Sequence, residues 1–325
     1  MRIVFHGGNA ASFRPGFDEL VGQGHSISVL PDDLKDDANR QLYSDADFIV
    51  GARFNKNLPV SPRLKLYHVP GAGYDAIDLD ALPASATVCN CFGHEPAIAE
   101  YVMAAILTRH IPLADADARL RQGDWKHWAG ALDRVHGEIS GKTIGLLGYG
   151  HIGKAIAVRA KAFDMRVHVA NRTPVATSAN VDRTFTLAQL AGFLNAVDVV
   201  VVSVPLAPET KGIIGAAAFA AMRPDAIIIN VGRGPTIDEQ ALYTALKERR
   251  IGGAIIDTWY AYPAPGKPNP HPSSLPFHEL PNILMTPHMS GWTNGTIRRR
   301  QQTIAENIVR RARNEPCINV VREGR

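Results

Sequence analysis

The chain has 325 residues, of which 46% are hydrophobic and 20% charged, and its formal net charge is +4. This length is too great for one compact core and predicts two domains. The balance of residues excludes a disordered chain, and no apolar run approaches the roughly eighteen residues needed to span a bilayer. We therefore expect no membrane association. Arginine runs at 298–300 and 310–313 lie on a predicted helix, which favours a solvated helix face over a nucleic-acid site.

Three cysteines, Cys89, Cys91 and Cys317, make an odd count without the spacing of a metal site. They predict free thiols, no bound metal and a cytoplasmic location, because disulfides persist mainly in oxidising compartments. The first residues, MRIVFHGG, predict a short strand rather than a signal peptide.

Short apolar runs alternate with polar or helical stretches in the first part of the chain, which predicts a small parallel sheet. A long helix is predicted from Pro96 to Gln122. We expect Trp125, His127 and Trp128, which follow it, to pack in the core or at a dimer contact, with lining of the substrate site as the less favoured alternative. The strands of this part are predicted at 3–5, 27–30, 48–50, 64–69 and 87–89.

A dinucleotide-binding βαβ unit is predicted between Lys142 and Thr173, where a strand, a G-x-G-x-x-G turn, a helix and a second strand follow at the right distances. Gly148 permits the tight turn, Gly150 lets the backbone approach a pyrophosphate, and Gly153 lets the helix pack closely. The first N–H groups of the helix attract the anion. An ordinary glycine turn is the alternative. We predict cofactor contacts from Gly148, Tyr149, Gly150, His151, Ile152 and Gly153.

The end of the second strand indicates which dinucleotide is bound. NAD-preferring proteins usually carry Asp or Glu there, which accepts hydrogen bonds from the ribose 2′-hydroxyl. This chain carries Asn171, Arg172 and Thr173 instead. Without the carboxylate, a 2′-phosphate meets no repulsion and Arg172 can bind it. We predict NADP(H), with NAD(H) as the alternative if Arg172 is only a solvated loop residue.

The remaining segments predict that the dinucleotide-binding domain is inserted into the other domain. A final helix, 293–313, lies beyond the last strand and is expected to return to the first domain. We predict a substrate-binding domain of residues 1–95 plus 291–325 and a dinucleotide-binding domain of residues 96–290, with ligands between them. Further strands are predicted at 198–204, 226–231, 254–257 and 283–285.

Charged side chains follow three of these strands at their carboxyl ends, where a doubly wound sheet binds its ligand. Arg233 lies on a glycine turn and can grip a carboxylate bidentately, unless it is a surface arginine satisfied by water. Asp257 ends the next strand. His288 follows the last strand and can exchange a proton near neutral pH, although a lone histidine is more often structural.

Together these segments resemble the D-isomer-specific 2-hydroxyacid dehydrogenase family over essentially the full chain. The resemblance is specific because it combines motifs from both predicted domains. The motifs are Pro70-Gly-Ala-Gly-Tyr-Asp75-x-x-Asp78, Ala99-Glu100, Gly148-x-Gly150-x-Ile152-Gly153, Pro205-Leu-x-x-x-Thr210, Asn230-x-x-Arg233-Gly234 with Asp238, and Asp257 with Thr286-Pro287-His288.

The resemblance implies an α/β protein of two doubly wound parallel-sheet domains, with a Rossmann domain inserted into a flavodoxin-like substrate domain. It implies a homodimer built around the segment after the interdomain helix. It also implies reversible hydride transfer between a nicotinamide and a small 2-oxo acid, of the kind that glyoxylate and hydroxypyruvate reductases catalyse.

The resemblance also assigns roles to residues. The amides of Ala72 and Gly73, with Arg233, would hold the carboxylate substrate, and His288 would donate the proton in reduction. His94 is expected to border the nicotinamide pocket, with helix capping as the alternative. Asp257 and the carbonyl of Val231 would orient the carboxamide. The cofactor site would further include Val204, Pro205, Thr210, Gly232, His288, Ser290 and Gly291.

One position departs from the family. A Glu usually lies five residues after the strand-end Asp, where it pairs with the histidine and raises its pKa, but this chain has Tyr262. Tyrosine can orient an imidazole but brings no negative charge at neutral pH. We predict that Tyr262 belongs to the catalytic group and that proton donation by His288 favours lower pH.

Two alternative functions remain open. The segment from Asp257 to Pro265 resembles formate dehydrogenases, which oxidise a small anion and need no proton transfer. Those relatives carry Asn where this chain has His94, and they have an extended N-terminal region. Other relatives sense nucleotides with little turnover, but the presence of both Arg233 and His288 favours an enzyme.

Overall fold

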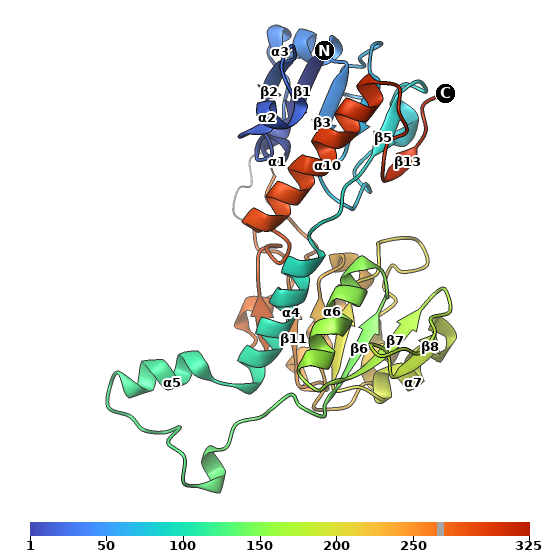
Figure 1. The fold of residues 1–325 in the computed structure, drawn as a ribbon. Coiled ribbons are helices and arrows are strands. Elements are labelled where there is room, and N and C mark those ends of the chain that lie inside the picture. The colour runs from blue at the N-terminus through green and yellow to red at the C-terminus, as the bar shows by residue number, and fades with distance from the viewer. Residues whose placement is uncertain (265–269) are drawn as a thin grey trace. The chain divides into compact units, whose positions relative to one another are not determined.

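The computed structural model describes residues 1–264 and 270–325 (Figure 1). Pro265, the last residue of the formate-dehydrogenase-like motif, lies outside the described residues. The chain divides into two compact units. The first comprises Met1–His94 and Trp292–Arg325, and the second is the continuous segment Glu95–Gly291. The second unit is therefore inserted into the sequence of the first, and each is described by itself.

The first unit is built on a sheet with the strand order β13-β5-β4-β3-β1-β2. Its strands are β1 (Arg2–His6), β2 (Ser26–Leu30), β3 (Phe48–Gly51), β4 (Leu66–His68), β5 (Thr87–Cys89) and β13 (Val320–Arg322). Its helices are α1 (Gly7–Ala11), α2 (Phe17–Val21), α3 (Asp37–Ser44), the 3₁₀ turn η1 (Leu79–Ala81) and α10 (Asn294–Ala312). All neighbouring strands pair in parallel except β13, which runs antiparallel to β5 at one edge.

The second unit contains a sheet with the order β12-β11-β10-β9-β6-β7-β8, in which every pair is parallel. Its strands are β6 (Thr143–Leu147), β7 (Arg166–Asn171), β8 (Arg183–Thr186), β9 (Val199–Val202), β10 (Ile227–Asn230), β11 (Gly253–Ile256) and β12 (Ile283–Met285). Its α-helices are α4 (Glu95–His110), α5 (Leu113–Leu120), α6 (His151–Ala162), α7 (Leu190–Asn195), α8 (Ala216–Ala221) and α9 (Glu239–Lys247). Short 3₁₀ helices are η2 (Leu132–Arg134), η3 (Leu187–Gln189), η4 (Gly234–Thr236) and η5 (Phe277–Glu279).

The central strands of the second unit form its buried core. Every residue of β6, β9, β10 and β11 is buried, and most are Val, Ile or Leu. Helices cover both faces of a parallel sheet, so such strands are apolar throughout rather than alternating. The order of strands is that of a Rossmann domain, with the reversal between β6 and β9. The predicted α/β fold with two parallel-sheet domains is confirmed.

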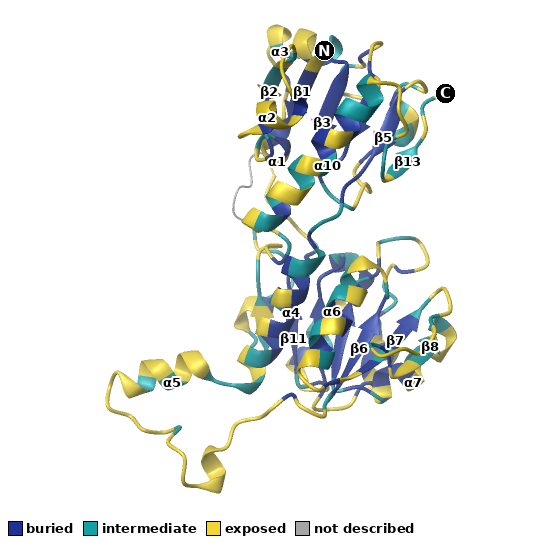
Figure 2. Cartoon of the chain, in the orientation of Figure 1, coloured by how far each residue is buried: buried dark blue, intermediate teal, exposed yellow. Residues whose placement is uncertain are grey.

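The predicted single helix from Pro96 to Gln122 is wrong. The chain forms α4, breaks at Ile111 and Pro112, and resumes as α5. Proline lacks the N–H that a helix interior needs, and its ring clashes with the preceding turn. After α5, the segment 121–138 is almost wholly exposed, and Figure 2 shows it projecting as an arm from its unit. No helix among the described residues is long and apolar enough to cross a bilayer.

A buried histidine joins the sheet of the first unit to its C-terminal segment. His68 of β4 and Asn307 of α10 are both fully buried. The Asn307 Nδ2 donates to His68 Nε2 at 3.0 Å and to the carbonyl of Ile318 at 2.9 Å, while Oδ1 accepts from the Ile318 amide at 2.8 Å. This orientation makes Nε2 an acceptor, so Nδ1–H donates to the Val69 carbonyl at 3.1 Å. The imidazole is therefore neutral, and burial lowers its pKa from 6.5 to about 4.

This pKa makes the stability of the protein depend on pH. Between pH 6.5 and pH 4 the unfolded chain binds a proton at His68 that the folded chain does not, so stability falls as the pH falls through this range. We expect a loss of about 2 kcal/mol from this residue between pH 7 and pH 5. In urea denaturation, His68→Gln should remove that part of the pH dependence, because glutamine does not titrate.

The control is His136→Gln, which changes an exposed histidine and should leave the pH dependence unaltered. An unchanged difference between pH 7 and pH 5 in His68→Gln would show that another group is responsible.

Candidate active site

The glycine turn lies where the strand order of the second unit reverses. It follows β6, whose neighbours are β7 and β9, and ligands of doubly wound sheets bind at this point beyond the carboxyl ends of the strands. Gly148 has φ of 98°, which few other residues adopt. A Cβ on Gly153 would collide with the carbonyl oxygen of Gly148, so close packing of α6 on the turn requires glycine there.

Gly150 is a glycine for a different reason. A Cβ at this position would meet no protein atom within 4 Å, and its φ of −80° is accessible to any residue. Neither packing nor backbone geometry within the protein explains the glycine. Gly150 is the N-cap of α6, where unpaired N–H groups and the helix dipole favour an anion. The open space fits a bound pyrophosphate.

The strand-end residues that bear on cofactor choice form a small network. The Asn171 amide oxygen accepts from the Tyr149 amide at 3.2 Å, and its nitrogen donates to the Thr173 carbonyl at 2.9 Å. The Arg172 side chain is 77% exposed and pairs with Glu209 at 3.0 Å. Arg172 is thus an exposed, already paired cation at the predicted position of the 2′-phosphate.

The turn after β9 holds Glu209 in place. The Thr210 hydroxyl donates to the Pro205 carbonyl at 2.6 Å and accepts from the Ala207 amide at 2.8 Å. Thr210 and the preceding Val204 are both buried. Val204, Pro205 and Thr210, which are predicted to contact the cofactor, therefore also form the turn that carries Glu209.

Arg233 follows β10 on a turn held by side chains. The Asn230 side chain accepts from the Gly232 amide at 3.1 Å and donates to the Arg233 carbonyl at 3.0 Å. The turn runs against the end of β11, because a Cβ on Gly234 would collide with the backbone of Trp259. Arg233 is half-buried, and its guanidinium donates to the Gly232 carbonyl at 3.0 Å. The preceding Val231 is buried, and its amide donates to the Val202 carbonyl.

Asp257 organises the loop that carries His288. Its side chain is fully buried and accepts hydrogen bonds from the Thr286 hydroxyl at 2.6 Å, the Met289 amide at 2.8 Å and the Ser290 amide at 2.9 Å. Since Thr286 donates its proton to Asp257, the Tyr101 hydroxyl must donate to Thr286, at 2.7 Å. Burial raises the pKa of Tyr101 to about 12, which keeps this donor protonated. Because Asp257 has no exposed surface, the role predicted for it, orienting a carboxamide, stays a prediction.

His288 and Tyr262 lie in contact. The Tyr262 hydroxyl is 3.0 Å from His288 Nδ1, and it also accepts a hydrogen bond of 3.0 Å from the Trp259 amide. The Trp259 indole donates to the Thr286 carbonyl at 2.7 Å, so one residue ties Tyr262 to the 286–290 loop. His288 has φ of 57°, a left-handed conformation that is uncommon for non-glycine residues. The loop bonded to Asp257 maintains it.

The predicted substrate residues Ala72, Gly73 and His94 belong to the first unit. The Ala72 carbonyl accepts from the Asn90 side chain at 2.7 Å, while the amides of Ala72 and Gly73 donate to no described residue. His94 is buried. Two successive backbone amides without an acceptor among the described residues can bind an anion.

Two arginines that sequence analysis assigned to a solvated helix face support this loop. Arg300 of α10 donates to the Pro70 carbonyl at 3.2 Å, and Arg299 donates to the Gly93 carbonyl at 2.7 Å. Arg299 is exposed, as expected of a solvated face, whereas Arg300 is half-buried. The arginine run carried no signal for this role, because its partners are backbone atoms distant in sequence.

The expected core packing of the tryptophans after the long helix is also wrong. Trp125 and Trp128 are 63% and 60% exposed. His127 lies 2.8 Å from the Asp115 carboxylate, which has its pKa lowered to about 2 by this contact and by Arg119. The other expectation, a dimer contact, stays a prediction.

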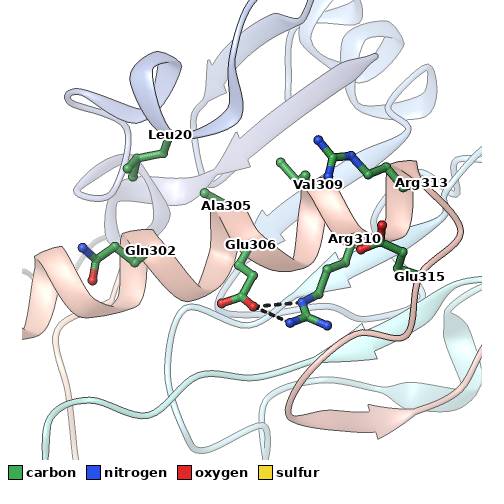
Figure 3. A pocket seen from close by; sticks show the side chains of 8 residues that line it. All are labelled: Leu20, Gln302, Ala305, Glu306, Val309, Arg310, Arg313 and Glu315. Carbon is green, nitrogen blue, oxygen red and sulfur yellow. Dashed lines mark hydrogen bonds and ion pairs between the residues drawn. The ribbon is translucent and has the colours of Figure 1, made fainter.

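A surface hollow of about 420 Å³ lies elsewhere on the first unit (Figure 3). None of the predicted site residues lines it, and an ion pair between Glu306 and Arg310 at 2.7 Å crosses it. Half of the residues that line it are charged, and they come from α10 and the turn after it, with Leu20 of α2. Among the described residues, no group of three or more His, Cys, Asp and Glu side chains could hold a metal ion.

Comparison with known proteins identifies the family. The model of the D-isomer specific 2-hydroxyacid dehydrogenase NAD binding domain matches residues 102–290. The chain is 32% identical over 255 residues to the glyoxylate reductase of Thermococcus gammatolerans, a match that covers 77% of this chain and 73% of that protein. The chain belongs to the D-isomer-specific 2-hydroxyacid dehydrogenase family, as the motifs predicted.

Two further comparisons show how far the likeness extends. The chain is 32% identical over 290 residues to the D-3-phosphoglycerate dehydrogenase of Methanocaldococcus jannaschii, covering 85% of this chain but 52% of that protein. It therefore spans about half the length of that relative. Among solved structures, an acyclic imino acid reductase in complex with NADPH and D-Arg is 25% identical, with a TM-score of 0.80 and coverage of 99% and 100% of the two chains.

The contrast between Gly150 and Gly153 can be tested by two matched substitutions. We expect Gly150→Ala to leave the thermal unfolding midpoint unchanged and to weaken NADPH and NADH binding by about tenfold or more, because its methyl group enters space that only the ligand fills. Gly153→Ala should instead lower stability by about 1–3 kcal/mol. Calorimetric unfolding and nucleotide fluorescence titration measure the two effects. A destabilised Gly150→Ala with normal nucleotide affinity would contradict this assignment.

Proposed function

We propose that this chain is an NAD(P)-dependent oxidoreductase that interconverts a small 2-hydroxy acid and its 2-oxo acid. The observation that carries the proposal is the arrangement at one end of the second sheet. There the open anion position at Gly150, the half-buried Arg233 and the Tyr262–His288 pair all follow the carboxyl ends of parallel strands. A nucleotide-sensing protein needs the first feature, whereas the presence of the other two favours an enzyme.

The residues divide the chemistry between them. Arg233 and the amides of Ala72 and Gly73 would hold the substrate carboxylate, since a guanidinium matches a carboxylate bidentately. His288 would donate a proton to the oxo oxygen as negative charge develops there, which stabilises the transition state more than the ground state. Asp257 holds the His288 loop and, with the carbonyl of Val231, would orient the carboxamide. A nicotinamide cofactor would supply the hydride.

The function is tested by mixing purified protein with NADPH or NADH and following the loss of nicotinamide absorbance with glyoxylate, hydroxypyruvate, pyruvate and phenylpyruvate. We expect turnover with at least one acid. His288→Gln should lower kcat by roughly a hundredfold or more, because the proton donor is lost. Arg233→Gln should act mainly on kcat/KM, by roughly tenfold to a hundredfold, because it removes a charged hydrogen bond to the carboxylate.

Tight nucleotide binding without turnover of any acid would instead support a nucleotide-sensing protein. Turnover of formate without turnover of 2-oxo acids would support a formate-dehydrogenase-like activity.

The proposed cofactor is NADP(H), with NAD(H) as the alternative. Support comes from Asn171 in place of an acid, from the exposed Arg172 and from the NADPH bound to the related imino acid reductase. We expect Arg172→Ala to weaken NADPH binding by roughly tenfold to a hundredfold and NADH binding by less than about twofold.

Glu209→Gln is the matched variant. It releases Arg172 from an exposed ion pair of about 1 kcal/mol or less, so NADPH should bind up to about fivefold more tightly while NADH is unaffected. Equal effects of Arg172→Ala on both nucleotides would remove the argument for NADP(H).

We also propose a homodimer in which the arm of residues 121–138 packs on a second copy. Exposed apolar side chains on this arm include Leu132 at 90% and Val135 at 73%. A patch of this kind is unusual on a monomer. Light scattering after gel filtration should give a dimer mass that Leu132→Asp with Val135→Asp reduces to a monomer. Val60→Asp, at an exposed apolar position of the first unit, is the control and should stay dimeric.

A further inference from the structure

We propose that Asn90 is a positioning residue for the substrate carboxylate. Its side chain holds the Ala72 carbonyl and thereby keeps the Gly73 amide turned outward, beside the Ala72 amide, where both can bind the anion. The inference rests on the proposed function for its ligand, a small 2-oxo acid. The geometry that carries it lies entirely within the first unit, where Asn90 directly follows β5.

Two successive carbonyls of the loop after β4 point to the same neighbouring segment. The Gly71 carbonyl accepts a hydrogen bond of 3.1 Å from the Cys91 amide, and the Ala72 carbonyl accepts one of 2.7 Å from the Asn90 side chain. In an extended strand, successive carbonyls point to opposite sides. The backbone therefore turns at Ala72, and both carbonyls face residues 90 and 91.

The direction of these carbonyls determines the direction of the amides. No described peptide bond is cis, and in a trans peptide the N–H group points opposite to the C=O group. The Gly71 carbonyl shares its peptide with the Ala72 amide, and the Ala72 carbonyl shares its peptide with the Gly73 amide. Both N–H groups therefore point away from residues 90 and 91. Successive amides that point to one side of the backbone form a concavity that binds anions.

The peptide between Ala72 and Gly73 depends on a side chain for its orientation. The Gly71 carbonyl is held by a backbone amide, whereas the Ala72 carbonyl is held by the Asn90 side chain. Glycine accommodates both signs of φ, so the peptide plane before Gly73 can rotate at little cost. Half a turn would place a carbonyl oxygen where the N–H group had been, and this oxygen would repel an anion. Asn90 opposes the rotation, because the rotated carbonyl would lose its hydrogen bond.

Asn90 is itself held by the C-terminal segment of the chain. Its side chain and backbone are 7% exposed, and its amide donates to the Asn319 carbonyl at 3.1 Å. This carbonyl directly precedes β13, which pairs with β5. Arg300 of α10, in the same C-terminal segment, donates to the Pro70 carbonyl at 3.2 Å. The segment after residue 291 therefore orients the loop at two points.

A matched variant separates positioning from stability. Thr87 lies at the opposite end of β5, is 3% exposed, and accepts a hydrogen bond of 3.3 Å from the Gly324 amide. Asn90→Leu and Thr87→Val each remove one buried hydrogen bond from the same strand region with little change in side-chain shape. We expect both to lower the thermal unfolding midpoint, by about 2–4 °C each. Only Asn90→Leu should affect the substrate.

Steady-state kinetics test the positioning role with the 2-oxo acid that the natural protein reduces. We expect Asn90→Leu to raise KM for the acid about tenfold, to change kcat less than about threefold and to leave KM for the nucleotide unchanged. Asn90→Ala, which adds no bulk, is the second variant and should give the same pattern. Thr87→Val should retain the natural KM. An unchanged KM in both Asn90 variants would overturn the proposal.

Binding of oxamate, an unreactive analogue of a 2-oxo acid, tests the amides directly. In protein labelled with ¹⁵N-glycine and saturated with nucleotide, the Gly73 amide is identified among 28 glycines as the signal lost in Gly73→Ala. We expect oxamate to shift this signal, with a dissociation constant about tenfold higher in both Asn90 variants but not in Thr87→Val.

The two possible failures are distinguishable. A Gly73 signal that does not respond to oxamate in the natural protein, or equal oxamate affinity in the Asn90 variants, would overturn the positioning role. Absence of turnover with every acid, together with the expected oxamate response, would contradict the proposed enzymatic function and support an anion-binding loop that Asn90 orients.

Discussion

The buried carboxylate of Asp257 is the interaction on which the candidate site depends. A buried charge is tolerated only when hydrogen bonds satisfy it, and here three donors from one short loop do so. The loop therefore has one conformation, in which His288 adopts a left-handed backbone. Tyr101, on a different element, completes the chain of donors through Thr286. The position of the histidine thus results from the packing of β11, the 286–290 loop and α4 in the second unit.

The glycines of the candidate site serve two different physical purposes. Gly153 and Gly234 are required by the protein itself, because a Cβ at either would collide with backbone. Gly150 faces space that no protein atom fills, so no contact within the protein requires a glycine there, and a bound anion would explain it. This distinction separates a structural turn from a ligand site and gives the dinucleotide interpretation its firmest support.

Much of the fold followed from sequence patterns. Apolar strands with helices between them predicted two parallel sheets, and the helix predicted over 293–313 matches α10, which Thr293 caps. The sequence patterns failed where a single residue, or a partner distant in sequence, determined the local structure. Pro112 divided the predicted long helix, the exposed Trp125 and Trp128 lacked a core to join, and β13 was missed because its three residues pair with β5, far away in sequence.

The sequence by itself determined the fold class, the family and the residue types of the site, because these depend on local spacing and on motifs of adjacent residues. Only the tertiary structure decided which partners those residues have. Glu209 reaches Arg172 and Asn307 reaches His68 across gaps of many residues. Tyr262 meets His288 in the same way, and the Trp259 amide donates to the Tyr262 hydroxyl. Hydrogen-bond direction is a property of three-dimensional neighbours, so no spacing in the chain could have specified it.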